Sequence, residues 1–210
     1  MTFTNHVIYA LLWLSFGVVH SVLASATVKT SLANLLGAGY RLAYNIFAAL
    51  HIGAIMAVGK LYLASGAEHY AFAGIPAMAL NAALVLGVLV LIASVLEYDL
   101  GRFSGMAQLR AARSGEYLTE DEPLILGGLH QYVRHPIYSG AFLVLFGGAW
   151  DEFSLATAIW GSLYLVIGTW FEERKLVTLY GNAYRVYRSQ VPAFFPWKGK
   201  VDIAVSGDAP

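Results

Sequence analysis

The sequence predicts an all-α protein: a polytopic membrane helix bundle of about five transmembrane helices, with a cytoplasmic C-terminal helical segment. Three observations predict this fold class. Of the 210 residues, 58% are hydrophobic and 12% are charged, which is about half the charge of an ordinary soluble domain. Several uncharged apolar runs are long enough to cross a hydrocarbon core of ~30 Å. The basic residues lie almost entirely on one side of the membrane that these runs would cross.

The apolar runs divide the chain into five predicted spans within a single membrane domain, residues 1–210, a length that suits one domain. The spans cover residues 7–24, 42–63, 73–96, 135–150 and 153–171. Only Asp151 and Glu152 separate the last two, so these two form a tight helical hairpin. The fourth span is short for a full crossing, which means that it is tilted, begins inside a protein-lined cavity, or stops before the far interface.

The basic residues set the predicted orientation. With five spans, the segments after the first, third and fifth share one side, and only Lys60, at the far end of the second span, falls on the other side. The shared side holds the remaining twelve: Lys29, Arg41, Arg102, Arg110, Arg113, Arg134, Arg174, Lys175, Arg185, Arg188, Lys198 and Lys200. The positive-inside rule therefore places the N-terminus outside and the C-terminus in the cytoplasm, and we expect a bacterial inner membrane. No Lys or Arg precedes the first span, so it is not expected to be a cleavable signal peptide.

The composition excludes several kinds of site. The sequence has no cysteine, which rules out disulfides, thiolate metal ligands and a cysteine nucleophile. The formal net charge is zero and no basic block is interleaved with aromatic residues, so no nucleic-acid surface is predicted. His20 and His51 are unusual polar residues inside predicted spans, but a metal site would need further ligands at workable spacing. We predict no bound metal.

A polar, glycine-bearing segment, residues 127–138, directly precedes the fourth span. Pro136 suits the first turn of a helix, which places His135 at or near the N-cap. A helix that starts there would direct its first N–H groups toward the cytoplasmic interface, a suitable place for a carboxylate or phosphate. The alternative is that Arg134 and His135 only anchor the chain at the interface, and that the two glycines only form a turn.

A second polar cluster begins with Glu172, which directly follows the fifth span. The hairpin must bring the far ends of its two helices to the same face, so Arg134, His135 and Glu172 can meet in one polar pocket at the membrane edge. Glu173 is interpreted as a solvated helix end.

Two further groups have a structural interpretation as their first choice. Tyr184 and Tyr187 are neighbours on a predicted helix beside Arg185 and Arg188. This helix is interpreted as interfacial, with its tyrosines at headgroup depth, although it could also roof the pocket.

Glu97 and Asp99 close the third span on the cytoplasmic side. Solvation of both carboxylates is the first interpretation of these two residues. A role facing the substrate of the polar pocket is the alternative.

Residues 123–196 resemble the membrane methyltransferases typified by isoprenylcysteine carboxyl methyltransferase and the phospholipid methyltransferases. The shared pattern is Arg134, His135, Pro136, Tyr138 and Gly140, then Glu172, Glu173, Leu176, Gly181, Tyr184, Tyr187, Val191, Pro192 and Pro196. The resemblance implies an enzyme that uses S-adenosylmethionine, held in a cytoplasmic pocket between the hairpin and the C-terminal segment. It implies cofactor contacts from Glu122, Pro123, Leu124, Ile125, His130, His135, Pro136, Ile137, Tyr138 and Glu172, and catalytic roles for Arg134, His135 and Glu172.

The chain departs from the family pattern at three positions. His130 stands where the family usually has tyrosine, and Glu122 where the isoprenylcysteine enzymes have histidine. Those enzymes also place an arginine, as a partner for the acceptor, four residues before the first glutamate, where this chain has Gly168. The last departure puts a prenylated carboxylate acceptor in doubt.

The N-terminal half is similar to the methanethiol S-methyltransferase branch and its relatives associated with nitric oxide reductase. The similarity lies in His20 and Ser21, Ala24 and Ser25, Val28 and Lys29, and residues 41–45. It implies a small or lipophilic acceptor that enters from the bilayer, most simply a small thiol such as methanethiol. Carboxyl methylation of an isoprenylcysteine, methylation of a phospholipid amine, and a non-catalytic membrane assembly factor are the alternatives. A small transporter is less favoured, since no paired repeats with broken helices are visible.

Overall fold

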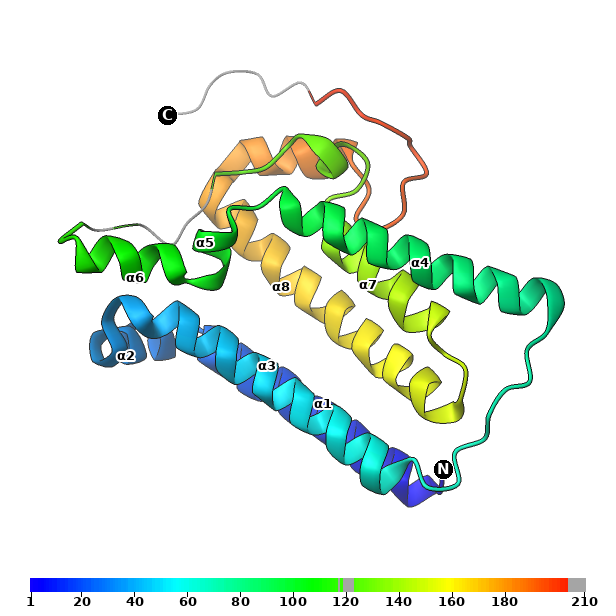
Figure 1. Cartoon of the computed structure of the whole chain (residues 1–210). Coiled ribbons are helices and arrows are strands. Elements are labelled where there is room, and N and C mark those ends of the chain that lie inside the picture. The colour runs from blue at the N-terminus through cyan, green and yellow to red at the C-terminus, as the bar shows by residue number, and fades with distance from the viewer. Residues whose placement is uncertain (117, 119–122, 204–210) are drawn as a thin grey trace. The chain divides into compact units, whose positions relative to one another are not determined.

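A computed structural model describes residues 1–116, 118 and 123–203 of the chain (Figure 1). It is 76% helical, and its described part contains no strand. The chain separates into two compact units. Unit 1 comprises residues 1–70, 98–122 and 151–156, and unit 2 comprises residues 71–97, 123–150 and 157–210. The single membrane domain stays a prediction.

Unit 1 is built on two long helices that pack side by side (Figure 1). Its helices in chain order are α1 (Phe3–Ala24), α2 (Ala26–Leu36), the 3-10 turn η1 (Gly37–Gly39), α3 (Tyr40–Val58), the π-helical turn η2 (Gly59–Leu63), α5 (Leu100–Ser104) and α6 (Met106–Arg113). Both histidines of the predicted spans lie between α1 and α3. His20 Nε2 is 2.6 Å from the hydroxyl of Tyr44, and His51 Nε2 is 3.4 Å from that of Ser15. Each ring thus has a hydroxyl partner on the other helix, while the buried Nδ1 of His51 has no hydrogen-bond partner among the described residues.

Unit 2 contains α4 (Gly74–Leu96), the 3-10 turn η3 (Gly128–Gln131), α7 (Pro136–Gly147) and most of α8 (Glu152–Gln190). Glycines bring the antiparallel helices α4 and α7 very close together. A Cβ on Gly87 would lie 2.7 Å from the backbone nitrogen of Val144, and one on Gly140 would lie 2.9 Å from that of Leu91. Small residues let membrane helices approach in this way, because packing rather than hydrophobicity drives their association.

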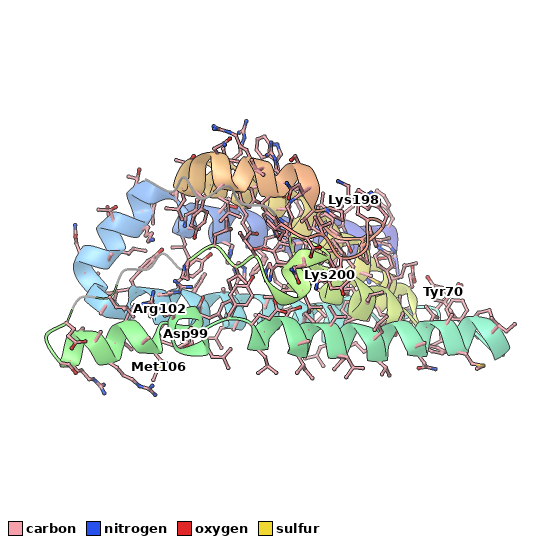
Figure 2. All side chains as sticks on the ribbon, turned by 90° about the horizontal axis from the view of Figure 1, so that it is seen from above. Tyr70, Asp99, Arg102, Met106, Lys198 and Lys200 are labelled. Atoms are coloured by element: carbon pink, nitrogen blue, oxygen red, sulfur yellow. The ribbon has the colours of Figure 1, made fainter. Side chains whose placement is uncertain are left out.

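The membrane helix bundle predicted from the sequence is confirmed. Among the described residues, four helical segments are long and apolar enough to cross a bilayer: Phe3–Ala24, Thr27–Leu63, Gly74–Leu96 and Glu152–Gln190. Side chains project from α4 in Figure 2. Many large apolar residues of this helix are exposed, among them Ile75, Val85 and Leu89. A surface of this kind is suited to lipid.

The fourth predicted span is short, as expected, and its helix is shorter than the predicted range. The predicted range 135–150 is helical only over Pro136–Gly147, which is 12 residues. At 1.5 Å per residue such a helix is about 18 Å long, well short of a hydrocarbon core of ~30 Å. Helix α7 alone is therefore too short for a full crossing.

Helix α8 is longer than a membrane requires. Its 39 residues would extend about 58 Å, so only the apolar part, residues 153–171, is needed to span. Beyond Phe171 the helix becomes polar, and at Gly181 the backbone takes a left-handed φ of 56° that kinks it. The portion after residue 171 therefore lies outside the membrane-spanning segment, where it can carry charged groups.

Candidate functional site

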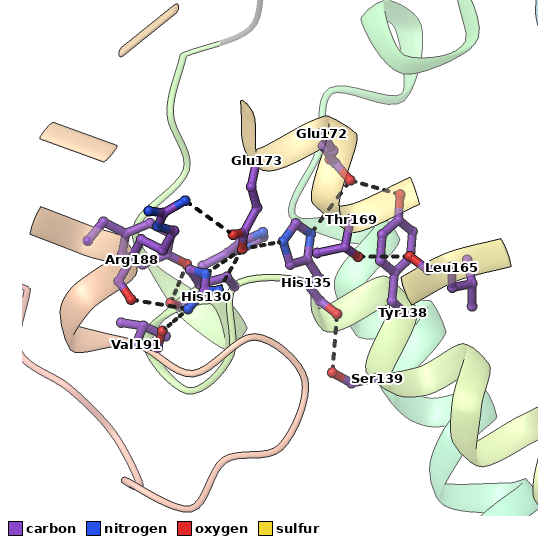
Figure 3. Close-up of polar contacts among 12 residues, drawn as sticks. His130, His135, Tyr138, Ser139, Leu165, Thr169, Glu172, Glu173, Arg188 and Val191 are labelled. Carbon is purple, nitrogen blue, oxygen red and sulfur yellow. Dashed lines mark hydrogen bonds and ion pairs between the residues drawn. The ribbon is translucent and has the colours of Figure 1, made fainter. Parts of the chain in front are cut away.

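Three helix ends of unit 2 meet at one place. Helix α7 runs antiparallel to α4 and to the spanning part of α8, so its first residue lies beside the end of α4 and beside the point where α8 leaves its apolar stretch. Glu97, His135 and Glu172 come from these three ends. Figure 3 shows the polar contacts around His135 and Glu172.

The start of α7 is fixed by the chain that follows α8. His135 is the N-cap and Pro136 the first helical residue, as the sequence predicts. The backbone nitrogen of Arg134 donates to the carbonyl of Pro192 at 2.8 Å, and that of His135 donates to Ala193 at 3.0 Å. These two bonds tie the C-terminal segment across the beginning of α7.

All three guanidinium nitrogens of Arg134 contact other groups of the protein. Its Nε and Nη2 lie 2.7 Å and 2.6 Å from Oε1 of Glu173. Its Nη1 donates to the carbonyl of Val191, and to that of Arg188 at 3.2 Å. The guanidinium thus connects α8 to the C-terminal segment, a structural task that sequence reasoning did not assign to it.

Glu173 is the more buried of the two glutamates. Its side chain is 12% exposed, against 42% for Glu172. Burial raises the pKa of Glu173, but hydrogen bonds and charge from His135 and Arg134 outweigh burial and lower it to about 2. The interpretation of Glu173 as a solvated helix end is therefore wrong. The sequence feature that could have indicated this contact is Arg134, which was predicted to face the same pocket.

His135 lies between the two glutamates (Figure 3). Its Nε2 is 3.2 Å from Glu173, and its Nδ1 is 3.6 Å from Glu172. The ring stacks on Tyr138 with centroids 5.4 Å apart and planes 5° apart, and the Tyr138 hydroxyl donates to Glu172 at 2.9 Å. The structure thus brings Arg134, His135 and Glu172 into one cluster, as the hairpin argument predicted. Of these three, Glu172 is the one that remains substantially open.

His130 is held on the other side of the cluster. It lies in η3 and is 4% exposed. Its Nδ1 is 2.8 Å from Oε2 of Glu97, whose Oε1 accepts from the backbone nitrogen of Leu129 at 2.7 Å. Burial lowers the pKa of His130 despite the opposing carboxylate. The solvated interpretation of Glu97 is therefore wrong, because both of its oxygens are bonded within unit 2.

The remaining predicted contacts are dispersed. Leu124 packs against a buried cluster that includes Tyr184 and Tyr187. Pro136 is buried, Ile125 and Ile137 are half-buried, and Pro123 is exposed. Glu122 lies outside the described residues.

The two tyrosines of the last helix are part of the protein core. Tyr184 and Tyr187 are each 1% exposed, and the Tyr187 hydroxyl donates to the carbonyl of His130 at 2.8 Å. Their interpretation as residues at headgroup depth is wrong. They hold the polar end of α8 against η3.

Comparisons with known proteins agree with the family resemblance. The chain is 39% identical over 75 residues to methanethiol S-methyltransferase 1 of Bradyrhizobium diazoefficiens, covering 35% of this chain and 26% of the relative. It is 38% identical over 74 residues to the methanethiol S-methyltransferase of Crocosphaera subtropica, covering 34% and 28%. It is 32% identical over 83 residues to the protein-S-isoprenylcysteine O-methyltransferase of Schizosaccharomyces pombe, covering 37% and 34%.

These matches span about a quarter to a third of the length of the curated relatives. No family model matches the chain, and no solved structure matches it. Within the described residues, no group of three or more His, Cys, Asp or Glu side chains could hold a metal ion. The resemblance stated from the sequence is confirmed: over about a third of its length, the chain is similar to methanethiol S-methyltransferases and to an isoprenylcysteine O-methyltransferase.

Proposed function

We propose that this chain is an integral membrane methyltransferase that moves a methyl group from S-adenosylmethionine to a small thiol such as methanethiol. The observation that carries the proposal is the similarity to proteins named for that reaction. The cluster around His135 supports it, because it joins a basic ring, an open carboxylate and a tyrosine hydroxyl at one membrane edge. We further propose that this edge is cytoplasmic, where the cofactor is available, and that the membrane is a bacterial inner membrane.

The residues present fit the proposed cofactor. Its ammonium and ribose hydroxyl groups need acceptors, and the carboxylate of Glu172 is 42% exposed while one of its oxygens accepts from Tyr138. Its sulfonium cation also favours a negatively charged surrounding, and Glu172 and Glu173 both lie there. The start of α7 adds the positive end of a helix dipole, which suits the cofactor carboxylate. Glu172, Tyr138 and His135 would hold the cofactor.

When bound, S-adenosylmethionine supplies an electrophilic methyl group on a sulfonium sulfur. Transfer of that methyl group to the acceptor sulfur would need mainly alignment of the two and exclusion of water, and Glu172, Tyr138 and His135 would provide the alignment by holding the cofactor. Alignment can supply about 7 to 11 kcal/mol of the barrier. The thiol must also lose a proton, since the thiolate is the nucleophile and an ordinary thiol has a pKa near ~8.5.

We assign the thiol proton to His135. Its Nε2 lies 3.2 Å from Glu173 and donates to that carboxylate, whereas its Nδ1 lies 3.6 Å from Glu172, beyond hydrogen-bond distance, and is the nitrogen left to accept the proton. The positive charge that the ring gains would then face both carboxylates. Arg134 is bonded to Glu173 and to backbone carbonyls, and we therefore give it a positioning role in place of direct contact with the thiolate.

A small thiol is favoured over a prenylcysteine carboxylate by Gly168. A Cβ at this position of α8 would meet nothing within 4 Å, so the space for a side chain exists but no arginine fills it. A carboxylate acceptor would lack its cationic partner there.

The test is a product assay on the purified protein in detergent with S-adenosylmethionine. We expect the thioether dimethyl sulfide from methanethiol and no methyl ester from a farnesylcysteine analogue. Preferential methylation of the farnesylcysteine analogue, or of phosphatidylethanolamine, would reject the thiol assignment. No methylation of any of the three would favour a non-catalytic assembly factor.

A further inference from the structure

We propose that Glu97, at the end of α4, is a positioning residue of the cofactor site, because it fixes the ring of His130 in one tautomer. The inference rests on the methyltransferase function proposed above. The tautomer itself is a property of the protein alone and can be measured without cofactor or acceptor. Both residues belong to unit 2, so their contact lies within one compact body.

Both carboxylate oxygens of Glu97 have hydrogen-bond partners. Oε1 accepts from the backbone nitrogen of Leu129 at 2.7 Å, and Oε2 lies 2.8 Å from Nδ1 of His130. An ionised carboxylate only accepts hydrogen bonds, so Nδ1 must carry a proton. In the neutral imidazole Nε2 is then the lone-pair acceptor. Glu97 thus determines which nitrogen of His130 can accept a hydrogen bond.

The turn that carries His130 is shaped around this carboxylate. Gly128 has a left-handed φ of 58°, and a Cβ at this position would collide with the Glu97 carboxylate. On its other side, the carbonyl of His130 accepts from the buried hydroxyl of Tyr187 at 2.8 Å. Turn η3 is therefore held between the end of α4 and the polar end of α8, and Glu97 cannot move without moving His130.

His130 is also close to the proposed cofactor residues. Burial lowers the pKa of His130 most, the bond and charge of Glu97 oppose that shift, and the charge of His135 adds to the lowering. Figure 3 draws His130 in the same group of polar contacts as His135 and Glu173. The tautomer of His130 thus sets a hydrogen-bonding group next to His135. If Glu97 were only a solvated helix end, it would not determine the tautomer of His130.

The first experiment reads the tautomer directly. Nitrogen-15 NMR of histidine-labelled protein in detergent at pH 8, without cofactor, should show His130 protonated at Nδ1; the signal is assigned by its loss in His130→Gln. In Glu97→Gln, the amide oxygen keeps the Leu129 N–H and the amide NH₂ faces Nδ1, so the proton should move to Nε2. Asp99→Asn is the matched control and should leave the signal unchanged, because Asp99 caps α5 in unit 1.

The second experiment links the tautomer to binding. We expect Glu97→Gln to weaken S-adenosylmethionine binding on the order of tenfold in calorimetry, the effect of losing one charge-assisted hydrogen bond in the support of the site. A wild-type His130 protonated at Nε2 overturns the inference even if the variant does not fold. A shifted tautomer with unchanged affinity overturns the positioning role. A wild-type protein that has the expected tautomer but binds no cofactor refutes the proposed function instead.

Discussion

Arg134 and Glu173 form a two-point contact, in which Nε and Nη2 of the arginine lie 2.7 Å and 2.6 Å from one carboxylate oxygen. The same guanidinium donates to two carbonyls near the end of α8. This pair therefore fastens the C-terminal segment to the start of α7, and it positions His135 beside Glu172. The proposed chemistry depends on that fastening.

Glu173→Gln should destabilise the protein strongly. Removing one charge from a mostly buried pair leaves the other uncompensated, and we expect a loss of about 3 kcal/mol, at the lower end for buried pairs because both side chains keep some exposure. Glu172→Gln, at a more exposed carboxylate, should change stability by less than ~1 kcal/mol. Unfolding curves of both variants in detergent give the comparison. Equal and small losses would mean that the contact is not structural.

Stability should fall as the pH drops below about 6.5, in part through His130. Burial lowers the pKa of His130 below its usual 6.5, so the unfolded chain takes up this proton first. The stabilising contribution is thus complete above pH 6.5 and is lost as the pH falls through 6.5 toward the lower folded value. Melting temperatures between pH 8 and 5 measure it. The slope should be shallower in His130→Gln and unchanged in His69→Gln, a substitution of an exposed histidine in unit 1.

Two glycine substitutions should have different effects on the stability of the folded protein. Gly87→Ala places a methyl group 2.7 Å from the backbone of α7, and we expect a cost of about 1 to 3 kcal/mol from overpacking. At Gly53, in α3, a Cβ meets nothing within 4 Å, so Gly53→Ala should be neutral or stabilising by up to ~1 kcal/mol. Thermal unfolding in one detergent measures both. A neutral Gly87→Ala would contradict the close approach of α4 and α7.

The proposed orientation predicts the sides of the two ends. Reporter fusions should place Thr4 outside and Lys200 in the cytoplasm, because twelve of the thirteen basic residues would then be cytoplasmic. Activity of a cytoplasmic reporter at Lys200 and of a periplasmic reporter at Thr4 is the expected pair of results. Finding both positions on one side would reject the prediction of five spans, because an odd number of crossings places the two ends on opposite sides.

The fold class and the position of the cluster could be predicted from the sequence. Long uncharged runs identify membrane helices because the bilayer demands internal pairing of every backbone group. The short turn at Asp151 and Glu152 implied that His135 and Glu172 share one end. The extent of α7 could not be predicted in the same way, because Gly147 and Gly148 end the helix inside a run that remains apolar.

The partners within the cluster were harder to predict. Glu172 and Glu173 differ only in their rotation around α8, and tertiary contacts decide which one faces Arg134. Glu97 lies 33 positions before His130, and their contact depends on the packing of α4 against α7. Tyr184 and Tyr187 look interfacial in sequence, but the kink at Gly181 precedes the buried segment that carries them. Each of these errors concerns a contact between elements, which a local pattern does not contain.

Calorimetry on the purified protein in detergent measures whether the Glu172 end of unit 2 binds S-adenosylmethionine, as proposed. We expect saturable binding to the wild-type chain, weakened in Glu172→Gln by about 1.5 to 3 kcal/mol through loss of a charge-assisted hydrogen bond. The unfolding curve of this variant should stay close to that of the wild type. Absence of binding to the folded wild-type protein, or equal affinity in Glu172→Gln, would show that the cofactor does not bind at this end of unit 2.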